Sequence, residues 1–297
     1  MKTIKRDRLG YLFILPFFII LVTFIIYPII YSIYISFTEW QGALTPPKWI
    51  GLDNYIRVFK EKYFIQSIGN TWILWLGCII PQMIFGLGLA AMLTDSNIKG
   101  KAFFRWAYFV PNLITMASIA ALFVYLLDWK TGALNEFLIS IGVIEKHINW
   151  LQNVAATRIA ISFILFWMWF GYTMIIFMAG IKAIPSELYE AARVDGANKW
   201  QSFRFITLPS LKPIMAYQVV TSVIGGLTMF DIPFILTGRK GSPNFKALTM
   251  VNRFYNVTFS SNPQYGFGAA MSVLLFIMVM IFSLIAYRFV LRDLKDK

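Results

Sequence analysis

Residues 184–209 have the sequence IPSELYEAARVDGANKWQSFRFITLP, a long polar interruption between the strongly apolar runs of the chain. This stretch predicts two short helices. Pro185 suits a first helical turn, where its missing N–H costs nothing, and Gly196 suits a left-handed C-terminal cap. Asn198 and Gln201 have the spacing of a capping box, which starts a second helix that Pro209 ends. The prediction is a helix–turn–helix that lies outside the apolar runs.

The chain as a whole has the composition of an integral membrane protein. Hydrophobic residues make up 58% of the 297 positions and charged residues 14%, which is far from the pattern of a soluble protein. The net charge of +13 could suggest nucleic acid, but the basic residues stand singly between apolar runs, and loop bias and contact with anionic lipid explain them better. Cys78 and His147 are the only residues of their types, so neither a disulfide within the chain nor a metal site is predicted.

Six uncharged runs are long enough to cross a bilayer, which takes about 20 apolar residues. The helix–turn–helix separates the fourth run from the fifth, and an even number of spans places both termini on one side. We expect one transmembrane helix in each of the runs 10–37, 63–94, 106–127, 159–181, 213–230 and 254–287.

The basic residues predict the orientation of these spans. Assigning the N-terminus, residues 95–105, residues 182–212 and the C-terminal tail to the cytoplasm places 16 of the 27 Lys and Arg residues there, which is the bias of cytoplasmic loops. Both termini and the helix–turn–helix are therefore expected inside the cell. The chain divides into an N-terminal transmembrane helix with an external loop (1–64), a transmembrane core (65–290) and a cytoplasmic tail (291–297).

The spans lack the groups that several other classes of membrane protein require. None has an ionisable residue in its interior, and Asp231 lies near the external end of the fifth, so proton or ion coupling has no evident carrier. The chain has no Gly-x-x-x-x-Gly-Lys-Ser/Thr loop for nucleotide phosphates. It has no nucleophile paired with a histidine, and Asp195-Gly196-Ala197 lacks the rest of the phospholipid head-group transferase motif. We therefore expect no enzymatic activity in this chain.

The polar stretch resembles the EAA signature of the membrane subunits of bacterial ABC importers. The resemblance implies an all-α integral membrane fold with six transmembrane helices, that of an ABC type I importer permease (MetI/MalF-like), whose cytoplasmic coupling-helix loop docks into a cleft of an ATPase subunit. Trp200 and Phe203, one turn apart, form an apolar ridge that suits such a groove, although residue types alone equally suit a helix on lipid headgroups. The positions that match the signature are Glu190, Ala191, Ala192, Gly196, Ile206, Leu208 and Pro209.

Three shorter stretches resemble the permeases of the carbohydrate-uptake branch, which are binding-protein-dependent and MalF-like. They are Gly51–Tyr55, Phe230-Asp231 ahead of Leu236-Thr237, and Tyr265–Ser272. Arg239 and Lys240 depart from that pattern, since they interrupt a turn that is glycine-rich in the family. The resemblance implies that the solute is a sugar, with an oligosaccharide the first expectation.

Aromatic and uncharged polar side chains in the spans are candidates for the sugar pathway, because rings stack on sugars and amides bind hydroxyl groups. Packing or an interfacial aromatic belt explains any single one of them at least as well. The candidates are Trp167, Trp169, Tyr172, Tyr217, Gln218, Asp231 and Asn252.

The resemblance also implies a set of partners in the cell membrane. It implies a second permease subunit, as a heterodimer or with less support a homodimer, an ATPase dimer that uses ATP and Mg, and an extracytoplasmic solute-binding protein. This chain itself is expected to bind membrane lipid and the sugar but no cofactor, metal or nucleic acid. The alternatives are an ABC permease for another polar solute such as glycerol phosphate, a self-sufficient secondary carrier, and a membrane scaffold without transport.

Overall fold

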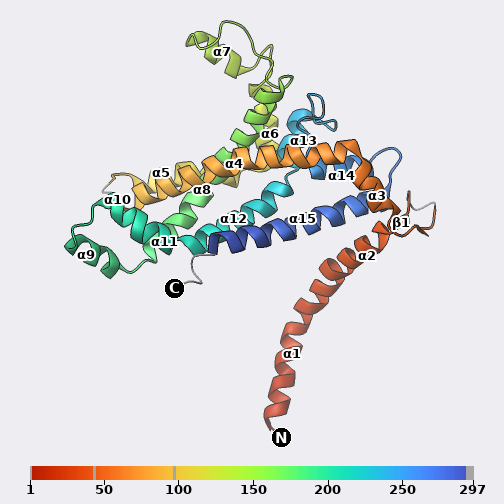
Figure 1. Ribbon diagram of the computed structural model, residues 1–297, viewed down its shortest axis with the longest axis horizontal. Coiled ribbons are helices and arrows are strands. Elements are labelled where there is room, and N and C mark those ends of the chain that lie inside the picture. Colours follow the sequence, from red (N-terminus) through yellow and green to blue (C-terminus); the bar gives the residue numbers. More distant parts are fainter. Residues whose placement is uncertain (1, 43–44, 96–97, 292–297) are drawn as a thin grey trace. The chain divides into compact units, whose positions relative to one another are not determined.

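The computed structural model describes residues 2–42, 45–95 and 98–291, and these are mainly helical (Figure 1). Most of the predicted tail, residues 292–297, lies outside the described residues. The predicted all-α membrane fold is confirmed. Five segments are long and apolar enough to cross a bilayer, and a sixth span results if one bent helix pair counts as a single span. The five are Phe13–Ser36, Lys62–Thr94, Val154–Lys182, Lys212–Thr237 and Tyr265–Val290.

The chain forms two compact units. One comprises the residues up to Glu61 together with Phe254–Phe276, and the other comprises Lys62–Arg253 together with the residues from Ile277 onward. The predicted domain boundaries at residues 64 and 290 came from the apolar pattern and the resemblance, and they stay a prediction.

The first unit begins with a long helical segment, formed by α1 (Lys2–Leu21), the π-helical turn η1 (Val22–Ile26) and α2 (Tyr27–Ser36). A two-stranded antiparallel pair follows, β1 (Thr38–Glu39) with β2 (Lys48–Trp49), which the sequence did not predict. The next helix is α3 (Asp53–Lys60). The Asn54 side chain donates to the backbone oxygens of Ser36 (3.0 Å) and Thr38 (2.8 Å), so α3 is fastened to the end of α2.

The third predicted span, 106–127, is wrong as a single straight helix. It is divided between α5 (Lys101–Leu113) and α6 (Met116–Leu126), which meet at 92°. Pro111 near the end of α5 has no N–H for the helical ladder. The hydroxyl of Thr115 then accepts from the N–H of Ser118 (3.2 Å) and caps the start of α6.

The last two predicted spans also have different bounds in the structure. The fifth does not end at Phe230, because α12 (Lys212–Leu227) is followed by α13 (Asp231–Thr237) and the two together form one candidate span. The run 254–287 holds two helices, α14 (Met250–Thr258) and α15 (Tyr265–Leu291), of which only α15 is long enough to cross.

The second unit is built on the pair α4 (Lys62–Asp95) and α8 (Val154–Lys182). Glycines on α4 let the two backbones approach, because a Cβ at Gly77 would lie 2.6 Å from Ser162 Oγ and one at Gly86 2.8 Å from Thr173 Cγ2. The Gln82 amide donates to Thr173 Oγ1 at 2.8 Å. A buried cluster fills the end of this pair beside α12, consisting of Ala90, Leu93, Met174, Phe177, Met178 and Leu211.

Candidate functional site

The polar loop between α8 and α12 forms the predicted helix–turn–helix. Its elements are α9 (Ser186–Val194), α10 (Lys199–Ser202), the π-helical turn η2 (Phe203–Thr207) and α11 (Leu208–Ser210). Gly196 has the predicted left-handed backbone, with φ of +79°. Asn198 and Gln201 form the predicted capping box. Two short helices therefore project from the spans, as the local signals indicate.

Both prolines of this loop act differently from the prediction. Pro185 is the N-cap of α9 and so precedes its first turn. Pro209 does not end a helix, because it lies inside α11 and the chain returns to helix at Lys212. The turn before it is π-helical, with the N–H of Leu208 bonded to the carbonyl of Phe203. This wider turn accommodates a residue that has no N–H and whose ring crowds the preceding turn.

The signature residues lie on the outside of this loop. Glu190 and Ala191 are exposed on α9, Ala192 is half-buried beside them, and Gly196 is exposed in the turn. In the described part of the chain the Glu190 carboxylate forms no ion pair, although Arg193 lies three residues further along α9. The others lie on the second half of the loop, with Ile206 and Leu208 half-buried and Pro209 exposed.

An apolar ridge lies on the second half of the loop. The rings of Trp200 and Phe203 stack with centroids 5.7 Å apart, as their spacing predicts. Trp200 is 66% exposed and Phe205 69%. Large aromatic surfaces on an otherwise polar loop are typical of a docking site.

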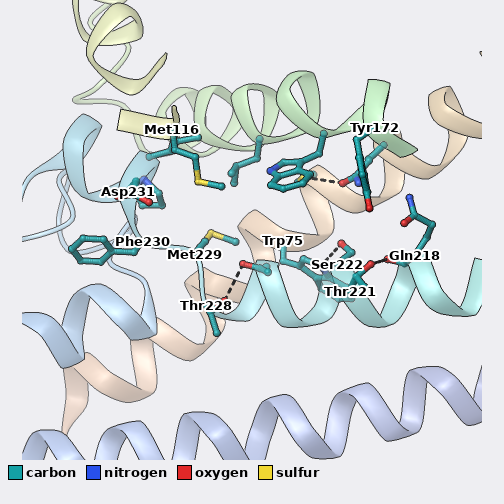
Figure 2. Close-up of a pocket in the computed structure, with 18 of the residues that line it drawn as sticks. Trp75, Met116, Tyr172, Gln218, Thr221, Ser222, Thr228, Met229, Phe230 and Asp231 are labelled. Carbon is teal, nitrogen blue, oxygen red and sulfur yellow. Dashed lines mark hydrogen bonds between the residues drawn. The ribbon is translucent and has the colours of Figure 1, made fainter. Parts of the chain in front are cut away.

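A cavity of about 400 Å³ lies within the second unit (Figure 2). Its walls come from α4, α8 and α12, and one end is closed by Met116 of α6 and the start of α13. The polar side chains among the lining residues are Gln82, Tyr172, Tyr217, Gln218, Thr221, Ser222, Thr228 and Asp231, and the aromatic ones also include Trp75, Trp169 and Phe230.

Five of the seven predicted pathway residues line this cavity: Trp169, Tyr172, Tyr217, Gln218 and Asp231. The structure does not bring the other two there. Trp167 packs edge-on against Phe123, with ring centroids 6.1 Å apart. Asn252 is fully buried, and its amide oxygen and nitrogen have no hydrogen-bond partner among the residues that the structure describes.

The residues of the α4 wall of the cavity were not among those predicted from the sequence. Trp75, Cys78 and Gln82 follow the spacing i, i+3, i+7 and therefore share one helix face. This spacing can be read from the sequence. Because α4 is apolar on most of its faces, however, the sequence does not indicate which face points into the cavity. Trp75 Nε1 donates to Ser222 Oγ of α12 at 3.0 Å, and a Cβ at Gly226 would collide with the Trp75 ring. The glycine therefore makes room for the indole.

Two tyrosines also line the cavity from different helices. They are Tyr172 on α8 and Tyr217 on α12. These two helices are the ones that flank the polar loop in the chain.

The loop after α13 is held by side chains of α4 and α8. The Asn70 amide donates to the carbonyls of Phe245 (2.8 Å) and Leu248 (3.0 Å). Arg158 donates to Asn70 Oδ1 (2.7 Å) and to the carbonyl of Lys246 (3.0 Å). Arg239 and Lys240 lie at the beginning of this hydrogen-bonded loop, and both are exposed. They are the two residues that depart from the family pattern.

One acidic group outside the spans has a clearly shifted pKa. The backbone N–H groups of Thr131 and Lys130 each donate to Asp128 Oδ1 at 2.9 Å, and the Thr131 hydroxyl adds a third bond. These bonds stabilise the charged carboxylate and lower its pKa. Within the described ranges, no three His, Cys, Asp or Glu side chains gather as a metal site would require, and the absence of a cofactor stays an expectation.

The family model of the binding-protein-dependent transport system inner membrane component matches residues 5–296. The chain belongs to this family. The resemblance to ABC importer permeases is therefore confirmed, and so is a multi-pass membrane protein. Its relatives include the lactose transport permease LacF of Rhizobium radiobacter, 31% identical over 96% of both chains. Another is the multiple sugar-binding transport permease MsmF of Streptococcus mutans, 32% identical over 93% of both.

The permease also resembles solved structures. It matches a chain of a bacterial ABC transporter involved in the import of the acidic polysaccharide alginate, with a TM-score of 0.85, 27% identity and coverage of 98% of both chains. A second structure shows such an alginate transporter in complex with an alginate pentasaccharide-bound periplasmic protein, and there the TM-score is 0.83 with 27% identity over 96% of this chain and 94% of that one. The predicted type I importer fold is confirmed by this agreement.

Proposed function

We propose that this permease forms part of the pore of a sugar importer, that an oligosaccharide is its solute, and that a separate ATPase subunit supplies the energy from ATP and Mg. The observation that carries the proposal is the cavity, which combines aromatic rings with uncharged hydroxyl and amide groups. Relatives named for lactose and for multiple sugars support it.

The cavity suits the two faces of a sugar ring. The C–H faces of a sugar stack on flat aromatic surfaces, which Trp169 and Tyr172 offer from α8. The hydroxyl groups need donors and acceptors, and Gln218 and Thr221 on α12 supply both kinds. A volume of about 400 Å³ falls within the range of small-molecule sites, roughly 300–1000 Å³.

The polar loop is the proposed attachment point of the ATPase. It follows the end of α8 at Lys182 after three residues, and α12 begins at Lys212 directly after it. Because both helices line the cavity, a displacement of the loop moves two cavity walls with little intervening flexible chain. ATP-driven closure of an ATPase dimer on this loop would switch the access of the cavity from one side to the other.

The other partners are supported by the family and by the alginate transporter solved with its periplasmic protein. A second permease subunit, in a heterodimer, completes the pore, and an extracytoplasmic solute-binding protein delivers the sugar. The ATPase lies in the cytoplasm, so the polar loop and both termini face the cytoplasm, in agreement with the bias of the Lys and Arg residues.

Replacement of Glu190 by Lys tests the proposal. In proteoliposomes with all partner subunits, Glu190→Lys is expected to abolish sugar uptake and the co-purification of the ATPase while the permease still inserts. Glu187→Lys is the matched control, since Glu187 is also exposed on α9 but is not a signature position, and it is expected to retain both. Normal uptake and ATPase recruitment in Glu190→Lys would contradict the proposal, as would ion-driven flux in liposomes that contain this chain alone.

A further inference from the structure

We infer that the solute of this cavity carries no negative charge, and that Asp231 is the residue that discriminates against anionic sugars such as uronic acids. This inference rests on the proposed sugar function and narrows it to neutral sugars. It concerns the charge of the solute that this cavity binds. Membership of the family does not decide that charge, because a transporter of similar structure is involved in the import of the acidic polysaccharide alginate.

The charge pattern of the cavity is the first argument. Its described lining residues include no Lys, Arg or His. The polar groups are amides, hydroxyls and phenols, and they bind neutral hydroxyl groups well. A carboxylate solute would leave water and find no cation to compensate the lost hydration, which makes its entry costly.

Asp231 is the second argument. It is the first residue of α13, it is half-buried, and it lies between Met116 and Phe230 at one end of the cavity (Figure 2). Its carboxylate has neither an ion pair nor a hydrogen bond to another described side chain. The charge is therefore not neutralised by the described part of the protein and acts on whatever occupies the cavity.

The effect of this charge differs between the two kinds of sugar. A neutral sugar donates hydroxyl groups to the carboxylate in charge-assisted hydrogen bonds, which are stronger than neutral ones. A uronate meets the like charge of the half-buried Asp231 carboxylate, and repulsion between unit charges several ångströms apart near a protein surface weakens binding by at least about tenfold.

The basic residues near Asp231 in the sequence do not offset its repulsion of anionic sugars. Arg239 and Lys240 follow α13, but both are exposed and neither lines the cavity. Arg158 is occupied by Asn70 and the carbonyl of Lys246. Anion attraction at those positions would act outside the cavity.

Equilibrium binding to the purified complex of this permease with its partner subunits, without the solute-binding protein, tests the inference. The probes are neutral oligosaccharides of two to five residues and uronic-acid oligosaccharides of the same lengths, with quenching of cavity tryptophan fluorescence as the readout. We expect at least one neutral sugar to bind and every uronate to bind at least tenfold more weakly. Asp231→Asn is expected to reduce that ratio severalfold, whereas Asp53→Asn, the same change at an exposed position of α3, leaves it unchanged.

Three results would overturn the inference. Uronates could bind the unmodified complex as tightly as neutral sugars, or Asp231→Asn could leave the ratio unchanged; in either case the sugar function stands and only the charge selection fails. If no sugar of either panel binds while the ATPase still co-purifies, the inference fails together with the sugar assignment, and the permease function stands.

Discussion

The hydroxyl oxygens of Tyr189 and Thr207 lie 2.8 Å apart and join α9 to the π-helical turn η2. Thr207 is 5% exposed and is the only buried residue within 184–209, whereas most of its neighbours in both halves of the loop are exposed. The bond links two segments that are otherwise connected through the turn at Gly196. A force applied to α9 therefore also reaches the segment that leads into α12.

Removal of this bond is expected to weaken transport without detaching the ATPase. Tyr189→Phe keeps the ring but loses the hydroxyl, which costs about 1 kcal/mol of local stability. Sugar uptake in proteoliposomes should fall severalfold, while ATPase co-purification stays unchanged. Tyr125→Phe is the control, because Tyr125 is 77% exposed on α6. Equal uptake by Tyr189→Phe and the unmodified permease would show that the bond does not transmit motion.

The left-handed backbone of Gly196 predicts a position-specific loss of ATPase recruitment. With φ of +79°, any side chain there is strained, and Gly196→Ala is expected to cost about 1 kcal/mol and to shift α9 relative to α10. Gly142→Ala is a matched control, since Gly142 also has a positive φ, +73°, and open space around its Cβ position. Co-purification of the ATPase should decrease for the first variant only. A loss in both variants would point to a general folding defect instead.

Two adjacent glycines of α12 both line the cavity but differ in the space around them. A Cβ at Gly226 would collide with the Trp75 ring, whereas one at Gly225 has nothing within 4 Å. Gly226→Ala should displace the indole, break its bond to Ser222, and destabilise the fold by about 1–3 kcal/mol. Tryptophan fluorescence is expected to change for Gly226→Ala and to stay normal for Gly225→Ala, because only the first substitution meets the Trp75 ring. Identical behaviour of the two variants would refute the role assigned to Trp75.

The lowered pKa of Asp128 predicts an acid-sensitive turn. Because its folded pKa lies below the ordinary value of about 3.9, the charged carboxylate stabilises the turn above that pH, and this contribution is lost as the pH falls through the folded pKa. Hydrogen exchange of the Lys130 and Thr131 amides should accelerate in this acidic range. Asp128→Asn keeps an oxygen acceptor without a titrating group and should show no such transition. The same acid transition in Asp128→Asn would assign it to another residue.

Features that depend on neighbours in the chain were predictable. The apolar runs establish helices that cross a membrane, because about 20 successive apolar residues have few other stable environments. Gly196 and the Asn198–Gln201 capping box define the polar loop, since each satisfies backbone groups within a few residues of itself. The same local character allowed the family to be recognised from seven spaced positions.

Only the tertiary structure decided which faces of the helices meet. A helix that is apolar on all sides gives no periodic signal for its inward face. The α4 wall with Trp75 and Gln82 was therefore missed, and Trp167 was named as a candidate for the sugar pathway although it does not line the cavity. The 92° bend between α5 and α6 and the π-helical turn before Pro209 were missed for a related reason. A proline in a helix can be accommodated in several ways, and the packing of the surrounding helices selects one of them.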